Sequence, residues 1–78
     1  MSLDVRPQRT HLTARGQEIL TLASQGLRTK QIARRMWLSH HTVRNHLKNA
    51  YKVLGATDLT EALLKAIARG QISLPPSL

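Results

Sequence analysis

The segment from Ser39 to Gly55 constrains the fold most, because as a helix it has two sharply different faces. At about 100° per residue, one side is entirely apolar and spans about 60°: Val43, Leu47, Ala50 and Leu54. The opposite side is entirely polar, with His41, Arg44, Asn45, Lys48 and Lys52. Ser39 is a strong N-cap, and Gly55 suits the left-handed residue that ends a helix. The pattern predicts a helix over residues 40–54 with one buried face.

Three further helices are predicted around this one. A Thr13 cap opens the first, and Gly26 ends it. A Thr29 cap opens a second of about two turns that reaches Met36. The last begins near Asp58, with Glu61 completing a capping box, and runs to Arg69 before Gly70. The chain is therefore predicted to be all-α, a four-helix bundle-like domain.

The domain boundaries follow from where these patterns stop. Residues 1–11 are polar and aperiodic and are expected to form a tail or linker, residues 12–70 the domain, and residues 71–78 a C-terminal tail. A chain of 78 residues allows one small domain. It has no cysteine, which excludes disulfides and thiolate metal sites.

Positive charge is concentrated in one part of the chain. The sequence has 12 Lys and Arg against 4 Asp and Glu, a net charge of +8. Residues 28–52 hold seven of these cations and no acid. This block covers the two central helices and predicts attraction to a polyanion. Only Trp37 and Tyr51 are aromatic, which disfavours single-strand binding by base stacking.

The second and third helices, with a turn of about three residues between them, make a helix-turn-helix. A B-DNA major groove is about 12 Å wide and admits one α-helix. Arginine can read guanine there and asparagine adenine, whereas lysine contacts bases or phosphates. We therefore expect helix 40–54 to read duplex DNA, with Arg44, Asn45 and Lys48 facing the bases.

The sequence resembles the LuxR-type, or GerE-like, helix-turn-helix domain of bacterial transcription regulators. The resemblance covers residues 12–66 and rests on ordered pieces: Leu12-Thr13-x-Arg15-x-x-Glu18-Ile19-Leu20, Gly26, Lys30-Gln31-Ile32-Ala33, Leu38-Ser39-x-x-Thr42-Val43-Arg44-x-His46-x-x-Asn49 and Leu54-Gly55. It implies a major-groove helix three and the same three base-facing residues. The expected backbone contacts are Lys30, His41, Thr42, Asn49 and Lys52.

The chain departs from the family pattern at four positions. Gly16 stands where the family usually has Glu, Val53 where it has a basic residue, Leu59 where it has Arg, and Ala50 where Ile is common. The first weakens a helix cap, and the last predicts a lighter core. Such domains usually follow a receiver or ligand-binding domain, as in response regulators, so the chain is either the C-terminal domain of a longer regulator or a small regulator by itself.

Helix four carries more apolar residues than one buried stripe needs. Leu64 and Ile67 lie outside the stripe and are expected to form a weak two-fold dimer contact, as is common in operator-binding proteins. The alternative is that they pack under the tails. Trp37 is expected to be a turn residue that covers the core, with insertion between bases as the less favoured interpretation.

Other functions remain as alternatives. A sigma factor region-four-like domain working with RNA polymerase has a similar opening and helix-turn-helix, and a transposase or resolvase DNA-binding domain is a weaker relative. A basic protein-interaction or RNA-binding module is the alternative from another class. Four scattered acids and histidines on different helix faces predict neither catalysis nor a metal or cofactor. No apolar run is long enough for a membrane span, and we expect a cytoplasmic, nucleoid-associated protein.

Overall fold

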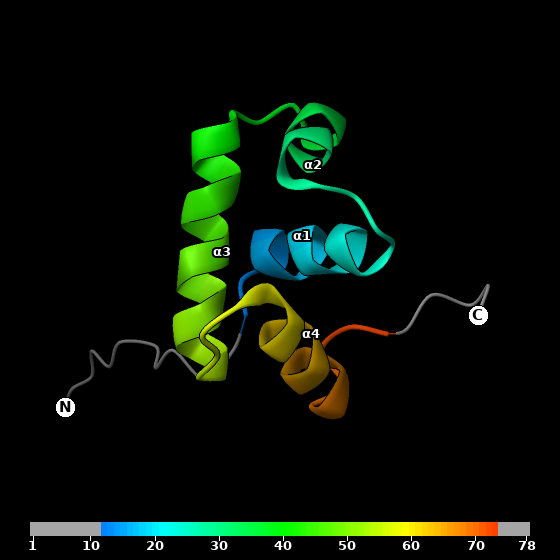
Figure 1. The fold of residues 1–78 in the computed structure, drawn as a ribbon, viewed down its shortest axis with the longest axis vertical. Coiled ribbons are helices and arrows are strands. Elements are labelled where there is room, and N and C mark those ends of the chain that lie inside the picture. Colours follow the sequence, from blue (N-terminus) through cyan, green and yellow to red (C-terminus); the bar gives the residue numbers. More distant parts are fainter. Residues whose placement is uncertain (1–11, 74–78) are drawn as a thin grey trace, which may run out of the picture.

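A computed structural model describes residues 12–73, which contain four helices and no strand. The helices are α1 (Ala14–Ser24), α2 (Thr29–Met36), α3 (His40–Leu54) and α4 (Leu59–Ala68). Figure 1 shows α3 along one side of the molecule, with α1, α2 and α4 gathered on the same side of it. The predicted all-α fold with a helix-turn-helix is confirmed. The tail expected at residues 1–11 and the end of the C-terminal tail, 74–78, lie outside the described residues.

The predicted limits of α3 are confirmed at both ends. Ser39 is the N-cap, and its hydroxyl accepts a hydrogen bond from the Thr42 amide at 3.0 Å. The same hydroxyl donates to Thr42 Oγ1 at 2.8 Å. At the other end, Gly55 has a φ of 68°, which a residue with a Cβ adopts only with strain. Local capping therefore fixes where α3 starts and stops.

Removing the Ser39 cap should lower stability without changing which DNA sequence is preferred. Ser39→Ala leaves the Thr42 amide without its side-chain acceptor, and loss of such a cap costs about 1 kcal/mol. Thermal or urea unfolding measures this loss. An unchanged free energy of unfolding would contradict the assigned start of α3.

The start of α2 differs from the prediction. Arg28 is the N-cap, and Thr29 is already the first helical residue. The Gln31 side-chain oxygen accepts from the Arg28 amide at 2.7 Å, as in one half of a capping box. A guanidinium has no acceptor for the other half. Thr29 therefore does not cap the helix, and its side chain projects from the first turn of α2.

The α4 start is held by a chain of polar contacts. Asp58 Oδ1 accepts from the Glu61 amide at 2.9 Å. The Glu61 carboxylate accepts from the amide and hydroxyl of Thr57, at 2.8 and 3.0 Å, and lies 3.3 Å from Lys65 Nζ. The predicted Asp58 cap is confirmed, but Glu61 reaches one residue further back than an ordinary capping box. The Thr57 backbone hydrogen bond is the largest cause that lowers the pKa of Glu61.

This lowered pKa predicts a loss of stability in acid. A carboxyl whose pKa is lower in the folded state stabilises the fold above its unfolded pKa, about 4.5, and this stabilisation disappears as the pH falls through the folded pKa. Glu61→Gln should therefore unfold more easily than the original chain near neutral pH, and the difference should shrink in acid. A difference that is the same throughout the carboxyl range would contradict the Glu61 contacts.

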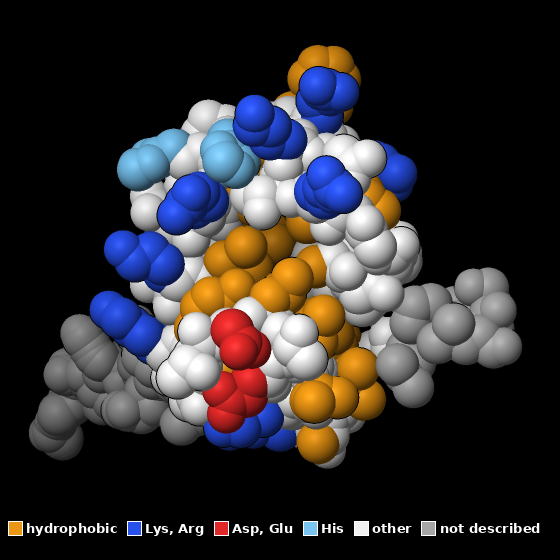
Figure 2. Space-filling model, viewed as in Figure 1, with side chains coloured by type: hydrophobic (Ala, Val, Ile, Leu, Met, Phe, Trp, Pro, Cys, Tyr) orange, Lys and Arg blue, Asp and Glu red, His pale blue; other side chains and the backbone are white. Residues whose placement is uncertain are grey.

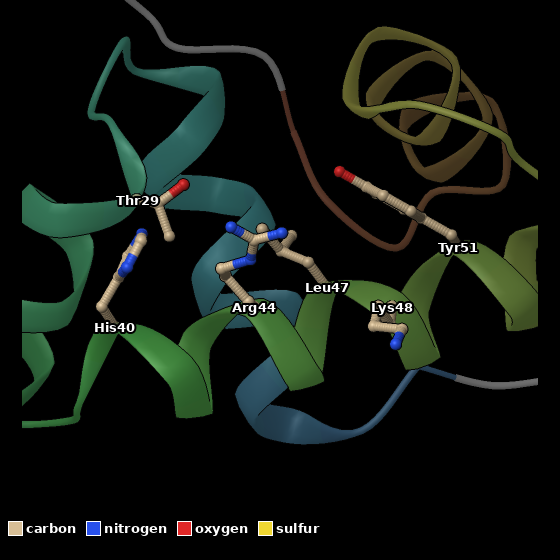
Figure 3. A pocket seen from close by; sticks show the side chains of 6 residues that line it. All are labelled: Thr29, His40, Arg44, Leu47, Lys48 and Tyr51. Carbon is tan, nitrogen blue, oxygen red and sulfur yellow. The ribbon is translucent and has the colours of Figure 1, made fainter.

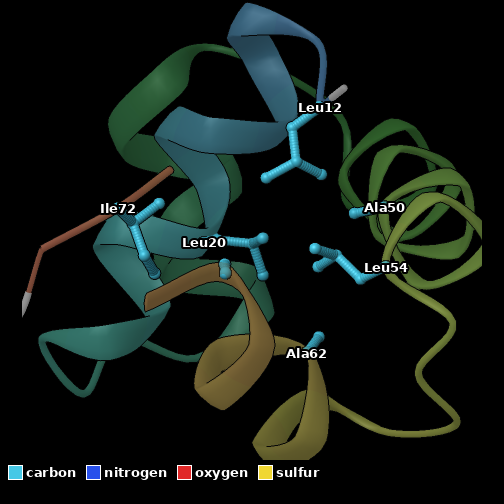
Figure 4. Packing of buried hydrophobic residues seen from close by; sticks show 7 residues of the cluster. Leu12, Leu20, Ala50, Leu54, Ala62 and Ile72 are labelled. Carbon is cyan, nitrogen blue, oxygen red and sulfur yellow. The ribbon is translucent and has the colours of Figure 1, made fainter. Parts of the chain in front are cut away.

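The core consists of two clusters that meet at Leu47. One lies between α1, α2 and α3, with Ile19, Ile32 and Val43 almost fully buried. The other lies between α1, α3 and α4, and Figure 4 shows its side chains pointing toward one another. It includes Ile72, which is 7% exposed. The packed region thus extends past residue 70, where the C-terminal tail was expected to begin.

The second cluster is loosely filled around Ala50, where the sequence predicts a smaller core residue than the family usually has. Ala50 is buried in it, and nearby Gly16 is buried in α1. A Cβ on Gly16 would lie 3.2 Å from Thr13 Oγ1, the atom that accepts a hydrogen bond from the Gly16 amide. Glycine at this position therefore lets the cap sit close to the helix. A cavity of about 150 Å³ remains beside both residues.

Candidate nucleic-acid interface

The acid-free basic block of residues 28–52 folds into α2 and α3. Figure 2 shows Lys, Arg and His side chains over the part of this face where Figure 1 places α2 and the start of α3. The acidic side chains visible on this face lie instead toward α4. Among the residues that the structure describes, the only ion pair joins Lys65 to Glu61. The cations of α2 and α3 are thus not neutralised by acidic partners within the described domain.

The structure brings together the three residues expected to face bases. Arg44, Asn45 and Lys48 are all exposed on α3. They line one shallow hollow of about 340 Å³ together with His40 and His41. Every side chain around this hollow can donate a hydrogen bond, and none is acidic. The surface is therefore suited to an anionic partner that carries acceptors.

A second hollow, of about 230 Å³, lies between the first turn of α2 and one flank of α3. Its lining is Thr29, His40, Arg44, Leu47, Lys48 and Tyr51. Figure 3 shows the His40 and Arg44 side chains directed from α3 toward Thr29. Arg44 and Lys48 thus border both hollows. Their long side chains can reach either the outer face or the groove between the two helices.

The side chains of Thr29, His40 and Tyr51 are not among the contacts expected from the sequence. The Thr29 side chain was assigned to capping, and His40 lies closer to the buried stripe of α3 than to its polar face. Tyr51 is half-buried. Burial first, and then the negative charge of Asp58, raise the pKa of its phenol, which therefore remains a neutral donor at physiological pH. Its place one turn beyond Leu47 on the α2-facing flank is the signal that could have identified it.

The expected backbone contacts do not gather at one place. Lys30, His41 and Lys52 are exposed. Thr42 is half-buried and its hydroxyl accepts from Ser39. Asn49 is exposed but lines the small cavity on the opposite flank, facing the start of α1. The five expected backbone-contact residues therefore lie around the outer face of α3, on both of its sides.

The two residues expected at a dimer contact differ in exposure. Leu64 is 64% exposed on α4. Ile67 is half-buried and packs against the α1–α3–α4 cluster. Leu64 is thus an exposed apolar residue available to a partner, whereas much of Ile67 already serves the core.

Residues 12–73 contain neither a candidate metal site nor a candidate membrane span. The histidines, aspartates and glutamates of this part of the chain form no group of three that could hold a metal ion. No helix within it is long and apolar enough to cross a membrane.

Comparison with known proteins identifies the family. The luxR family of bacterial regulatory proteins matches residues 10–66. Spore germination protein GerE of Bacillus subtilis is 36% identical over 63 residues, which are 81% of this chain and 85% of GerE. Transcriptional activator protein VanR of Vibrio anguillarum is 41% identical over 70 residues, 90% of this chain but 29% of VanR. The chain thus spans most of one relative and under a third of the other.

Solved structures agree with the sequence comparison. The GerE structure matches with a TM-score of 0.79 at 36% identity, over 82% of this chain and 96% of GerE. A Vibrio cholerae VqmA–ligand–DNA complex matches with a TM-score of 0.73 at 30% identity, over 97% of this chain and 33% of VqmA. The resemblance seen in the sequence is confirmed. This chain belongs to the LuxR family of bacterial regulatory proteins, as a helix-turn-helix domain of the type that binds DNA in transcription regulation.

Proposed function

We propose that this chain recognises a specific duplex DNA sequence by placing the outer face of α3 in the major groove. The observation that carries the proposal is the hollow where Arg44, Asn45 and Lys48 meet, exposed and without an acid. The helix of 15 residues is about 22 Å long, and its diameter with side chains, about 10–12 Å, fits a groove about 12 Å wide. The function is regulation of transcription.

We assign direct base contacts to Arg44, Asn45 and Lys48. Arginine can bond two guanine acceptors, and asparagine can bond an acceptor and a donor of adenine. Phosphate contacts are assigned to Lys30, His41, Thr42, Asn49 and Lys52, which lie around the outer face. Such contacts fix orientation and carry no sequence information by themselves.

The hollow between α2 and α3 adds two candidates to this interface. Thr29 and His40 can donate hydrogen bonds from opposite walls, beside the Arg44 guanidinium. A phosphate near the start of α2 would also meet helix amides that have no partner within the helix. We propose that these two side chains help to anchor the DNA backbone where α2 approaches α3.

A duplex preference tests the proposal against its alternatives. We expect tight binding to a selected duplex, weaker binding to a scrambled one, and much weaker binding to single strands or double-stranded RNA. The deep, narrow major groove of A-form RNA does not admit α3. Affinity should fall steeply with salt, by about 0.9 decades per tenfold salt for each phosphate contacted. Equal affinity for RNA and DNA would favour an RNA-binding module instead.

We further propose a weak two-fold dimer through α4, centred on Leu64. Dimers are common among operator-binding proteins, and half-sites about one helical turn apart match their symmetry. A solved VqmA structure is described as a dimer; it is 33% identical to this chain, which covers 30% of VqmA. It supports self-association and does not locate the contact. The partly buried Ile67 would contribute only its exposed edge.

Leu64→Ala should weaken self-association, because each subunit loses apolar contact area at the two-fold axis. We expect a loss of about 1–2 kcal/mol of association free energy, with weaker cooperativity on paired half-sites and unchanged binding to one half-site. Sedimentation and duplex titrations measure both quantities. A chain that stays monomeric at high concentration and binds paired half-sites without cooperativity would contradict the dimer.

The remaining assignments follow from the DNA partner. The proposal involves no catalytic step and no cofactor. A protein that binds chromosomal DNA is expected in the cytoplasm with the nucleoid. RNA polymerase is a candidate second partner, as in the sigma factor region-four alternative. Co-migration of polymerase with the chain on a duplex, and its absence without the duplex, would distinguish recruitment from a sigma-like attachment.

A further inference from the structure

Trp37 occupies an unusual position between α2 and α3. Its side chain is 93% exposed, so it does not cover the core as expected from the sequence. Its backbone is left-handed, with φ 59° and ψ 39°. It is the only non-glycine residue with positive φ in the described part of the chain. The turn thus combines two unfavourable features, an exposed indole and a strained backbone.

The fold itself gives no reason for tryptophan at this position. The α2 C-cap is made by backbone hydrogen bonds, from the Trp37 amide to Arg34 and from the Leu38 amide to Ala33. Glycine or asparagine would make the same turn with less strain. Strained, exposed residues that do not stabilise the fold are found where a protein binds something else. The side chain of Trp37 is therefore better explained by contact with another molecule than by a role in the fold.

The surroundings of Trp37 select an anionic partner. Arg34 and Arg35 lie in the last turn of α2, and His40 and His41 begin α3. The sequence has no acidic residue between Glu18 and Asp58. The turn also adjoins the N-terminal end of α3, where the helix dipole is positive. A basic or neutral protein surface would gain little here, whereas a phosphate backbone matches the charge.

Trp37 is also continuous with the proposed DNA interface. Two residues separate it from His40, which lines both hollows on α3. The three residue steps from Trp37 to His40 span at most about 11 Å, so a helix end held in a groove brings this turn close to the groove edge. An indole combines a flat apolar face with one N–H donor. A deoxyribose offers an apolar surface, and the adjoining phosphate offers acceptors.

We propose that Trp37 packs on the sugar–phosphate backbone of the duplex that α3 reads, beside the N-terminal end of that helix. The indole face covers a deoxyribose, and the indole N–H donates to a phosphate oxygen. This contact depends on the proposed function, because it requires α3 to be in the groove. It adds affinity without sequence preference, since every nucleotide has the same backbone.

Trp37 is the single tryptophan of the chain, so its fluorescence reports on this site alone. The 78-residue chain would be titrated with a selected duplex labelled for anisotropy, and with a scrambled duplex at low salt. Tryptophan emission and its quenching by acrylamide would be recorded in the same samples. We expect changed emission and at least about twofold protection from acrylamide once anisotropy shows binding.

Three variants test the energetic side of the inference. Trp37→Gly should raise Tm by relieving the left-handed strain. It should also lower affinity for both duplexes by about fivefold or more, because tryptophan is enriched among the residues that carry binding energy. Trp37→Phe should retain most of the affinity, because the flat ring remains. Arg35→Gln is the matched control, because it removes one positive charge near the turn and keeps Trp37. It should reduce the salt dependence of duplex binding and leave the change in tryptophan emission on binding as in the original chain.

The outcomes separate this inference from the proposed function. If anisotropy shows no duplex binding, the proposed function fails and this contact fails with it. If the duplex binds while Trp37 stays equally open to acrylamide, only the contact is overturned, and the turn faces a protein partner or solvent instead. A loss confined to the selected duplex in Trp37→Gly would also overturn it, because that result indicates base insertion.

Discussion

Replacing Arg44 by alanine is expected to flatten sequence preference at one base pair of the site. Arg44 is exposed on the outer face of α3, one turn from the Ser39 cap, where recognition helices meet base edges. Losing a base-reading arginine costs about 1–3 kcal/mol on the preferred sequence. Binding to a scrambled duplex should change much less. The measurement is affinity for both duplexes across a salt series.

Lys30→Ala is the matched control, because it also removes one cation but from the start of α2. We expect affinity for both duplexes to fall equally and the salt slope to decrease by about one unit. Equal weakening of both duplexes by Arg44→Ala would instead make Arg44 a phosphate anchor. The hollow shared by Arg44 and Thr29 is the place where that contact would be made.

Leu54→Ala is expected to destabilise the domain strongly. Leu54 is 1% exposed in the cluster that joins α1, α3 and α4. Truncating a buried leucine to alanine costs about 2–5 kcal/mol, from lost apolar burial and the cavity left behind. Small domains have about 0.05–0.15 kcal/mol of stability per residue, so this change should remove a large part of the total. Urea unfolding measures the loss.

Leu64→Ala provides the same chemical change at a position that is 64% exposed. At concentrations where the chain is monomeric, it should change the free energy of unfolding by less than about 0.5 kcal/mol. Similar losses from the two variants would mean that Leu54 is not in the core, or that Leu64 is buried.

The fold could be predicted in most respects because its boundaries are set locally. Ser39 and Asp58 accept amide hydrogen bonds from residues three positions later, and Gly55 has the positive φ that its place requires. Such interactions depend on neighbours in sequence. The face of α3 followed from helical periodicity for the same reason, and its three proposed readers do line one hollow.

Other features could not be predicted from the sequence. They depend on contacts between residues distant in sequence, or on which of two neighbouring residues takes a position such as a helix cap. Ile72 reaches the core because the chain turns back after α4, and Gln17 donates to the Gln71 carbonyl at 3.1 Å. Arg28 rather than Thr29 is the N-cap of α2, because the Gln31 side-chain oxygen accepts a hydrogen bond from the Arg28 amide. A large apolar residue such as Trp37 is expected to be buried, but its side chain is 93% exposed on a residue with a left-handed backbone.

Methylation interference on a selected duplex tests most directly whether α3 occupies the major groove. Guanine N7 lies in the major groove and adenine N3 in the minor groove. We predict that methylating N7 of the guanine read by Arg44 blocks binding, that this block disappears in Arg44→Ala, and that N3-methyladenine has little effect. Binding that resists every N7 methylation but is blocked by N3 methylation would contradict the account, because the chain would then read the other groove.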